Sequence, residues 1–199
     1  MALQEKFNLR RSIYALGRQS TLDVSKIQKM IEEILLSTPS AFNSQSTRIV
    51  LLLGDDHIKL WDITKDALLE LIGEENFSGT KAKIEGCFQS GHGTILFFED
   101  QNVVKGLQEA FPLYKDSFPT FSEHTSAMHQ YAAWTRLAEI GYGATLQHYN
   151  PVIDADVANA WNLPESWKLV AQMPFGDILQ PAGEKEFNTI EDRFKVFGK

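Results

Sequence analysis

Three residues near the start of the chain, Arg10, Arg11 and Ser12, are of types that bind phosphate groups. A guanidinium gives a phosphate two parallel charged hydrogen bonds, and a serine hydroxyl adds a further donor. A second pair of cations, Arg193 and Lys195, lies on one side of an extended segment near the other end of the chain. If folding brings both pairs together, four cations surround one spot in a protein of net charge -7, and a phosphate is the natural occupant. The two arginines, taken alone, could instead be a solvated part of the surface.

The segment TPSAFNSQSTR, residues 38–48, supplies hydrogen-bonding groups just before a predicted buried strand. Its compact polar side chains are Ser40, Asn43, Ser44 and Gln45. A loop that enters a sheet is a good place to hold the polar edge of a ligand. Asn43 could instead close the turn that follows Pro39.

Motifs of several other chemistries are incomplete. GEENFSGTK, at 73–81, has five residues between its glycines instead of the four of a P-loop, and GHGTIL and GYGATL have leucine at the third glycine of a dinucleotide-binding motif. His124 and His129 are five residues apart, off the one-turn spacing of helical metal ligands, so we predict no metal site. Cys87 has apolar neighbours, which is typical of a buried, inert thiol, and no serine lies in a GxSxG motif.

Length and composition exclude further classes. The 199 residues are 43% hydrophobic, enough for one substantial core, so we expect a single domain over residues 1–199. The acidic balance argues against binding to nucleic acid or an anionic membrane, and the apolar runs are shorter than the roughly 20 residues that span a bilayer. One cysteine and no secretion signal predict a soluble protein of the reducing cytoplasm.

Two near-continuous apolar runs, residues 47–54 and 93–100, predict central strands that are covered on both faces. Each run leads into a predicted helix, the first capped by Asp55 or Asp56 and the second by Asp100. An earlier helix is predicted between the capping residue Asp23 and Pro39, because apolar residues recur there at steps of three and four. Residues 8–17 also have a short helical pattern.

A long central helix is predicted over residues 120–141, with Thr120 and Glu123 at the spacing of a capping box. Its apolar residues form two stripes, so we expect it to be covered on most sides. WKLVAQMPFG, residues 167–176, predicts another strand, and the tail at 191–199 predicts an edge strand or an arm. This order of elements indicates a three-layer α+β domain.

The order of four segments resembles the FMN-dependent nitroreductases over essentially the whole chain. They are RRS at 10–12, TPSAFNSQ at 38–45, GYGATLQHYNP at 141–151 and EDRFKVFGK at 191–199. The last three look most like a short branch that includes bacterial copper-induced nitroreductases and fungal fatty-acid-repression-type proteins. The resemblance implies a mixed, mainly antiparallel central sheet flanked by helices. It also implies a homodimer in which a C-terminal arm reaches the partner subunit.

The resemblance also implies which residues bind FMN. The residues that would hold the phosphate and ribityl chain are Arg10, Arg11, Ser12, Arg193 and Lys195. Those of the polar loop near the flavin ring are Ser40, Asn43 and Gln45. The segment whose backbone would pass along the flavin contains Gln147 and His148. His148 could instead be a core histidine.

Two departures from the family pattern concern the flavin and the acceptor. Tyr14 stands where many relatives have a cation that stabilises negative charge on the reduced flavin, and Lys81 or Lys83 could substitute for it. Phe42 stands where many relatives have a small hydroxyl residue, which implies a narrower, more aromatic pocket. The aromatic residues that could stack on a flat acceptor are Phe42, Phe77, Phe118 and Tyr149, each of which could instead belong to the core.

The implied activity is a ping-pong transfer of hydride, in which NADH or NADPH reduces FMN and leaves before a nitroaromatic or quinone-like acceptor takes the same place. No side chain has to act as a nucleophile, and protons can come from water. A role in stress defence would fit this chemistry. Two alternatives remain open: a flavin-binding or regulatory module without turnover, and an interaction domain with no cofactor.

Overall fold

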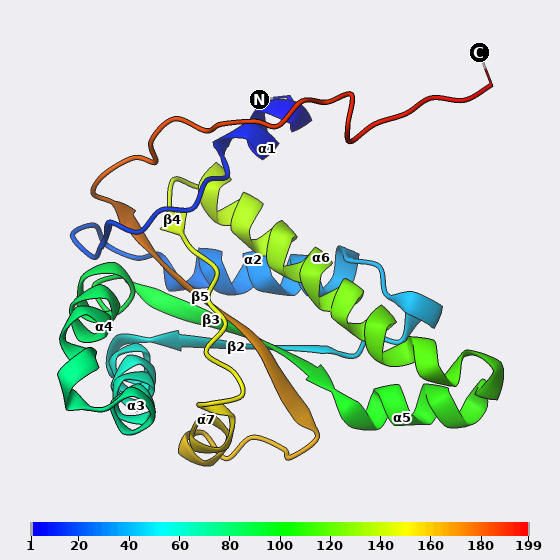
Figure 1. Ribbon diagram of the computed structural model, residues 1–199, viewed down its shortest axis with the longest axis horizontal. Helices are drawn as coiled ribbons and strands as arrows, with labels where there is room; N and C mark the ends of the chain where they lie inside the picture. Colours follow the sequence, from blue (N-terminus) through cyan, green and yellow to red (C-terminus); the bar gives the residue numbers. More distant parts are fainter. Residues whose placement is uncertain (1, 199) are drawn as a thin grey trace.

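The computed structural model describes residues 2–198 as a twisted sheet between two layers of helices (Figure 1). The strands are β1 (Leu16–Gly17), β2 (Thr47–Leu53), β3 (Gly93–Asp100), β4 (Gly143–Ala144) and β5 (Trp167–Ile178). Their order in the sheet is β1-β5-β3-β2, and β4 also pairs with β5. Each of these strand pairs is antiparallel, while a parallel bridge joins Ser12 to Ala144. The predicted α+β fold with a mainly antiparallel sheet is therefore confirmed.

The helices cover the two faces of the sheet. The helices on one side are α1 (Leu3–Leu9), α2 (Val24–Ser37) and α6 (Phe118–Glu139), and those on the other are α3 (Gly54–Ile72), α4 (Glu74–Cys87) and α7 (Asp154–Ala160) (Figure 1). The connections between these layers include helix α5 (Gln101–Ala110) and the 3₁₀ turns η1 (Ala41–Asn43) and η2 (Pro112–Ser117). None of the helices within residues 2–198 combines the length and apolar character needed to cross a bilayer.

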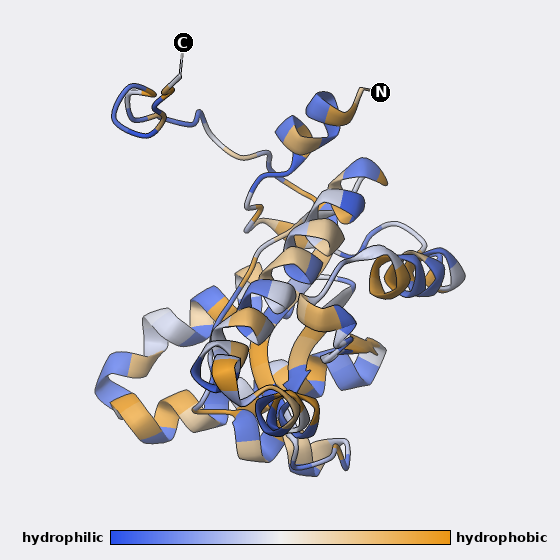
Figure 2. Ribbon diagram, turned by 90° about the vertical axis from the view of Figure 1, so that its right-hand side faces the viewer, coloured by the Kyte–Doolittle hydropathy of each residue, from blue (hydrophilic) through white to orange (hydrophobic). Residues whose placement is uncertain are grey.

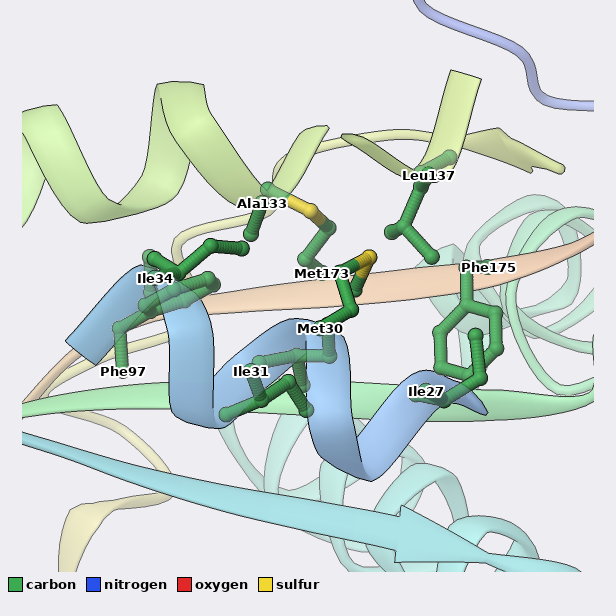
Figure 3. Close-up of a cluster of buried hydrophobic side chains, with 12 residues drawn as sticks. Ile27, Met30, Ile31, Ile34, Phe97, Ala133, Leu137, Met173 and Phe175 are labelled. Carbon is green, nitrogen blue, oxygen red and sulfur yellow. The ribbon is translucent and has the colours of Figure 1, made fainter. Parts of the chain in front are cut away.

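Strand β3 supplies side chains to both cores, because successive residues of a strand point to opposite faces. Ile95 and Phe97 are buried against α2 and α6, whereas Leu96 and Phe98 are buried against α3, α4 and α7. Figure 3 shows the first cluster, in which residues of α2 and α6 close over side chains of β3 and β5. The strands are the most uniformly hydrophobic elements, and the helices carry polar residues on their outer faces (Figure 2). The prediction of central, doubly covered strands is confirmed for β3 and is wrong for β2, which is the last strand of the sheet and has mostly half-buried side chains.

Two of the predicted helix caps, Asp23 and Asp100, are confirmed, and the cap predicted for α3 is wrong. Asp23 accepts a hydrogen bond from the Lys26 backbone N–H at 3.0 Å, and Asp100 accepts one from Asn102 at 3.1 Å. Helix α3 begins at Gly54, at least two residues earlier than predicted, so Asp55 and Asp56 lie inside its first turn rather than at the cap. Their negative charges are still favourable there because the amino end of a helix is electropositive.

Helix α6 differs most from its prediction. It begins at Phe118, and Pro119 in its first turn fixes that start, so Thr120 lies inside the helix and does not cap it. Met128 and Tyr131, both on the predicted buried stripes, are 42% and 44% exposed. The face turned to the sheet instead carries the hydroxyl and imidazole groups described below. The expectation that this helix is covered on most sides is therefore wrong for one chain.

The two ends of the chain are less regular than the sequence predicted. Helix α1 ends at Leu9, and residues 10–15 are extended, with the Ile13 N–H donating to the Ala144 carbonyl at 3.0 Å. The predicted helical pattern over 8–17 is therefore wrong. Residues 179–198 form no strand; they leave the body of the fold as an arm (Figures 1 and 2).

Candidate functional site

Arg10 lies on the carboxyl-terminal half of α6. Its guanidinium carbon is 4.6 Å from the centre of the Trp134 ring and 6.0 Å from that of Tyr131. The Trp134 indole is held in turn, because its N–H donates to the Ala144 carbonyl at 3.1 Å. The Nε of Arg10 is buried without a hydrogen-bond partner in residues 2–198. A buried charged donor is costly unless an acceptor reaches it, so this position suits an anion that brings oxygen atoms.

An open cavity of about 630 Å³ lies beside the extended segment that follows Arg10. Arg11 and Ser12 line one side, Cys87 at the end of α4 lines another, and tail residues 180–184 complete it. Arg11 donates a hydrogen bond to the Gly183 carbonyl at 2.7 Å, which ties the start of the tail to the N-terminal segment. Cys87, expected to be buried, is only half-buried. The cavity is within the size range of small-molecule sites.

The third predicted segment lies in the same region. Ser12 bridges to Ala144, and Gln147 exchanges two backbone hydrogen bonds with Gln172 of β5, at 2.7 and 2.9 Å. His148 comes next and is exposed, so it is not a core histidine. The structure thus brings the 10–12 and 143–148 segments together at the β5 edge of the sheet.

The tail cations are not part of this group within one chain. Arg193 and Lys195 are exposed, and neither side chain forms a hydrogen bond or ion pair with another described residue. Figures 1 and 2 show the C-terminal end of the tail away from the sheet. The four-cation cluster is therefore not formed by one chain.

The polar loop after α2 faces a different side of α6. Ser40 and Gln45 line a cavity of about 340 Å³ together with Thr47 and His129. His129 and Trp134 are five positions apart in α6, which corresponds to a rotation of about 140° around the helix at 3.6 residues per turn. One chain therefore does not bring the polar loop to the surface where Arg10 lies.

This loop has an unusual backbone. Phe42, Asn43 and Gln45 have φ angles of 57°, 51° and 51°, in the left-handed region that is costly for residues other than glycine. Asn43 closes the turn through its backbone N–H, which donates to the Ser40 carbonyl at 3.0 Å, while its side chain has no hydrogen bond within residues 2–198. The Ser40 hydroxyl accepts a hydrogen bond from the Gln45 backbone N–H at 3.0 Å.

Phe42 belongs to a cluster of aromatic rings, although it is 50% exposed. Its ring centre is 5.3 Å from that of Phe118, 4.8 Å from that of Phe111 and 5.9 Å from that of Tyr114. The structure therefore brings two of the four predicted acceptor-pocket residues together. Phe111 and Tyr114 were missed, because both precede or lie in the η2 turn and no periodic pattern marks them.

The other two predicted pocket residues lie elsewhere. Phe77 is half-buried on α4, and Tyr149 packs edge-on against Phe88, with ring centres 6.3 Å apart. Burial raises the pKa of the Tyr149 hydroxyl. Phe88 also has Tyr14 at 6.5 Å and the Lys83 ammonium at 5.8 Å from its ring centre. Lys83 and Tyr14 therefore both lie against the ring of Phe88. Tyr14 is the position where the resemblance implies a cation.

A buried carboxylate on the opposite side of the sheet was also missed. Glu99 is 1% exposed and accepts hydrogen bonds from the hydroxyls of Ser46, Thr47 and Ser122 at 2.5, 2.5 and 2.7 Å. The signal was available, because the alternation of β3 places Glu99 on the same face as Phe97, toward α6.

Ser20, His92 and Asp177 resemble a catalytic triad in composition but not in geometry. His92 Nε2 lies 3.2 Å from both the Ser20 hydroxyl and the Asp177 carboxylate, so no relay runs through the two ring nitrogens. Partial burial disfavours the Asp177 charge, but hydrogen bonds from Ser20, His92 and Gln19 outweigh it and lower the pKa of Asp177 to about 2. This cluster ties the turn after β1 to β5.

Comparison with known proteins points to one family. The profile of the nitroreductase family matches residues 9–177. Nitroreductase CinD from Lactococcus lactis, solved with chloramphenicol, is 48% identical, covers 99% of this chain and 100% of its own, and superposes with a TM-score of 0.91. The same protein has been solved with 4-nitrophenol, with a TM-score of 0.90. Among curated proteins of Saccharomyces cerevisiae, HBN1 is 36% identical over 94% of this chain and 93% of its own length. Nitroreductase FRM2 is 32% identical over 89% of each.

Proposed function

The chain belongs to the nitroreductase family and is an oxidoreductase, and we propose that it uses FMN to pass hydride from NADH or NADPH to nitroaromatic or quinone-like acceptors. The solved relative that binds chloramphenicol and 4-nitrophenol supports small aromatic acceptors. We further propose that one FMN-binding domain takes up the whole chain.

The observation that carries the proposal is the buried Arg10 Nε that lacks an acceptor. A phosphate oxygen would supply that acceptor, and the exposed Ser12 hydroxyl lies two residues further along the same extended segment. Arg11 and Ser12 line the adjoining cavity, whose volume suits part of a mononucleotide. The donor set is thus chemically suited to the FMN phosphate and ribityl chain.

The separation of the two motif sets supports a homodimer. Ser40 and Asn43 would have to come from the partner if they are to reach a flavin whose phosphate is held at Arg10, since α6 keeps the two regions on different faces. Met128 and Tyr131 of α6 border a groove of about 420 Å³ with Leu3 and Phe7 of α1, and all four side chains are at least one-third exposed. Burying this apolar groove against a second copy would stabilise the pair.

The tail fits the same assembly. It carries exposed apolar side chains that one chain leaves in water, among them Phe187, Phe194 and Phe197. A tail that packs these rings on the partner would carry Arg193 and Lys195 to the second chain, where they would complete the phosphate site. We propose this crossing as the reason that the four cations are apart in one chain.

In the proposed site, each segment of the chain has a distinct task. FMN, when bound, supplies the redox centre that accepts and returns hydride. The backbone at Gln147 and His148 is fixed by β5 and would support one edge of the ring system. Lys83 is the cation best placed to compensate for Tyr14 by stabilising negative charge on the reduced ring. The half-exposed Phe42 ring would border the slot for a flat acceptor.

The absorption spectrum of the purified protein tests the cofactor directly. We expect a yellow protein with bound FMN that oxidises NADH or NADPH steadily when a nitroaromatic or a quinone is present. A yellow protein without turnover would favour a flavin-binding or regulatory module instead. A colourless protein that stays colourless after FMN is added would overturn the proposal.

A further inference from the structure

We propose that Gln172 is a positioning residue whose side chain fixes the backbone at 147–149 and thereby raises the reduction potential of the bound flavin. The inference rests on the proposed function, because it takes the backbone at Gln147 and His148 as the support for one edge of the ring system. Gln172 lines none of the three cavities described above, so it acts only through that backbone.

Within the described chain, Gln172 of β5 makes all the hydrogen bonds that tie residues 147–149 to the sheet. The Gln147 backbone N–H donates to the Gln172 carbonyl at 2.7 Å, and the Gln172 N–H donates back at 2.9 Å. Pro174 has no N–H, so the ladder along β5 is interrupted and the pairing at Gln147 is an isolated bridge. The Tyr149 backbone N–H then donates to Oε1 of the Gln172 side chain at 2.8 Å. The side chain therefore holds the part of the segment that the ladder does not reach.

A polar side chain is costly at this place in the sheet. Gln172 is completely buried, and the residue opposite it on β3 is Leu96, which belongs to the apolar cluster against α3, α4 and α7. Opposite residues of an antiparallel pair point to the same face, so the carboxamide lies in an apolar layer. Burying an amide costs free energy unless hydrogen bonds compensate for it. The bond from the Tyr149 N–H provides that compensation at Oε1.

The partner also fixes the orientation of the carboxamide. A backbone N–H only donates, so it pairs with Oε1 and not with Nε2. The Nε2 of Gln172 is thereby left buried without an acceptor among residues 2–198. An apolar side chain of similar length would avoid this unpaired donor. The hydrogen bond to the segment is therefore what the carboxamide contributes here.

The segment that Gln172 holds presents its other edge away from β5. Successive N–H groups of an extended chain point to opposite sides. Those of Thr145 and Gln147 donate toward β5, at 3.2 and 2.7 Å, so those of Leu146 and His148 point outward. Neither of these two outward N–H groups has an acceptor in the part of the chain that the structure describes.

This outer edge is continuous with the proposed phosphate site. Ala144 pairs with β5 on one side, and Ser12 bridges to it from the other. The outward N–H groups at 146 and 148 follow along that same edge. Fixed N–H donors stabilise negative charge best when their positions need no reorganisation. A rigid backbone at 147–149 would therefore favour the reduced, more negative flavin over the oxidised one.

The test compares the holoenzyme of Gln172→Met with that of the wild type. Methionine has a similar length but leaves the Tyr149 N–H without its carboxamide acceptor. We expect the affinity for reduced FMN to fall about 10-fold more than that for oxidised FMN, which lowers the midpoint potential of the two-electron couple by about 30 mV. Slow reduction in the presence of a reference dye measures this potential, independently of turnover.

Thr94→Val is the matched control. Thr94 is completely buried on the same face of the sheet, and its hydroxyl accepts from the Trp61 indole N–H at 3.0 Å. This variant also leaves a buried N–H unpaired, but at a place away from 147–149. It should lose stability and keep the wild-type potential. An equal shift of potential in both variants would show a general effect of core damage and overturn the role of Gln172.

Hydrogen exchange of the wild-type protein, followed by NMR, keeps the inference testable if Gln172→Met folds poorly. The Tyr149 N–H should exchange slowly with or without FMN, because Gln172 pairs it, whereas the His148 N–H should become slow only when FMN binds. Fast exchange at Tyr149, no effect of FMN at His148, or an unchanged potential in Gln172→Met would overturn the positioning role alone. A wild-type protein that binds no FMN would overturn the proposed function itself, and this inference with it.

Discussion

The guanidinium carbon of Arg10 stacks 4.6 Å from the centre of the Trp134 ring, and the buried Nε of that arginine has no acceptor within residues 2–198. The contact fixes a cation on a helix whose neighbouring apolar face is exposed. It therefore links the proposed phosphate site to the proposed dimer surface, because both depend on α6. Loss of the phosphate site should therefore weaken the dimer, and loss of the dimer surface should weaken phosphate binding.

Arg10→Ala should raise the dissociation constant for FMN by roughly 10- to 100-fold, since a charged hydrogen bond contributes about 1.5–3 kcal/mol. Titration of the flavin-free protein with FMN, followed by absorbance, measures this change. Arg18→Ala removes an exposed arginine from the same N-terminal region and serves as the control. Equal affinities for the two variants would show that Arg10 is only a surface cation.

The backbone at Phe42 predicts that a glycine substitution there is more stable than an alanine substitution, which is the reverse of the usual order. At a φ of 57°, a residue with a Cβ atom costs about 1 kcal/mol more than glycine. Phe42→Gly should therefore unfold at higher urea concentration than Phe42→Ala, although both lose the contacts with Phe118 and Phe111. Both variants should have a raised KM for 4-nitrophenol. If alanine proved the more stable, the loop would not be strained at this position.

Burial predicts a pH dependence of stability at His57. Desolvation lowers the pKa of His57 from 6.5 to about 4, so the folded protein keeps this ring neutral while the unfolded chain takes up a proton. The neutral His57 ring makes its full contribution to the free energy of unfolding above pH 6.5. About 3 kcal/mol of that free energy is lost between pH 6.5 and pH 4. Urea unfolding across this range should show the loss in the wild type. His57→Gln should lack this part of it, and parallel curves for the two proteins would contradict the assignment.

The central strand β3 could be predicted from the sequence because it is buried on both faces. The run at 93–100 is apolar at nearly every position, and both cores draw side chains from it. Helix α6 could not be predicted in the same way, because apolar periodicity identifies a buried face only when the sheet beneath is apolar. Here Glu99 lies under the helix, so polar residues such as Ser122 and His129 turn inward while Tyr131 stays outside.

The candidate site was predictable in its parts but not in its assembly. The segments at 10–12 and 141–151 lie together as their chemistry suggests, because β4 and the bridge at Ser12 join them to β5. The loop at 38–45 and the cations of the tail do not join them in one chain. Sequence patterns give the types of residues that could bind a ligand, but they do not specify which segments the fold brings together.

The tail gives the sharpest test of the proposed two-chain site. Deletion of residues 191–199 should abolish retention of FMN and weaken the dimer, because it removes Arg193 and Lys195 together with Phe194 and Phe197. Flavin absorbance after gel filtration measures retention, and analytical ultracentrifugation measures association. The double variant Arg193→Ala with Lys195→Ala keeps the apolar rings, so it should lose FMN affinity while remaining dimeric. If the truncated protein kept its full flavin content, the tail would have no part in the site, and the phosphate would have to be held by the N-terminal segment alone.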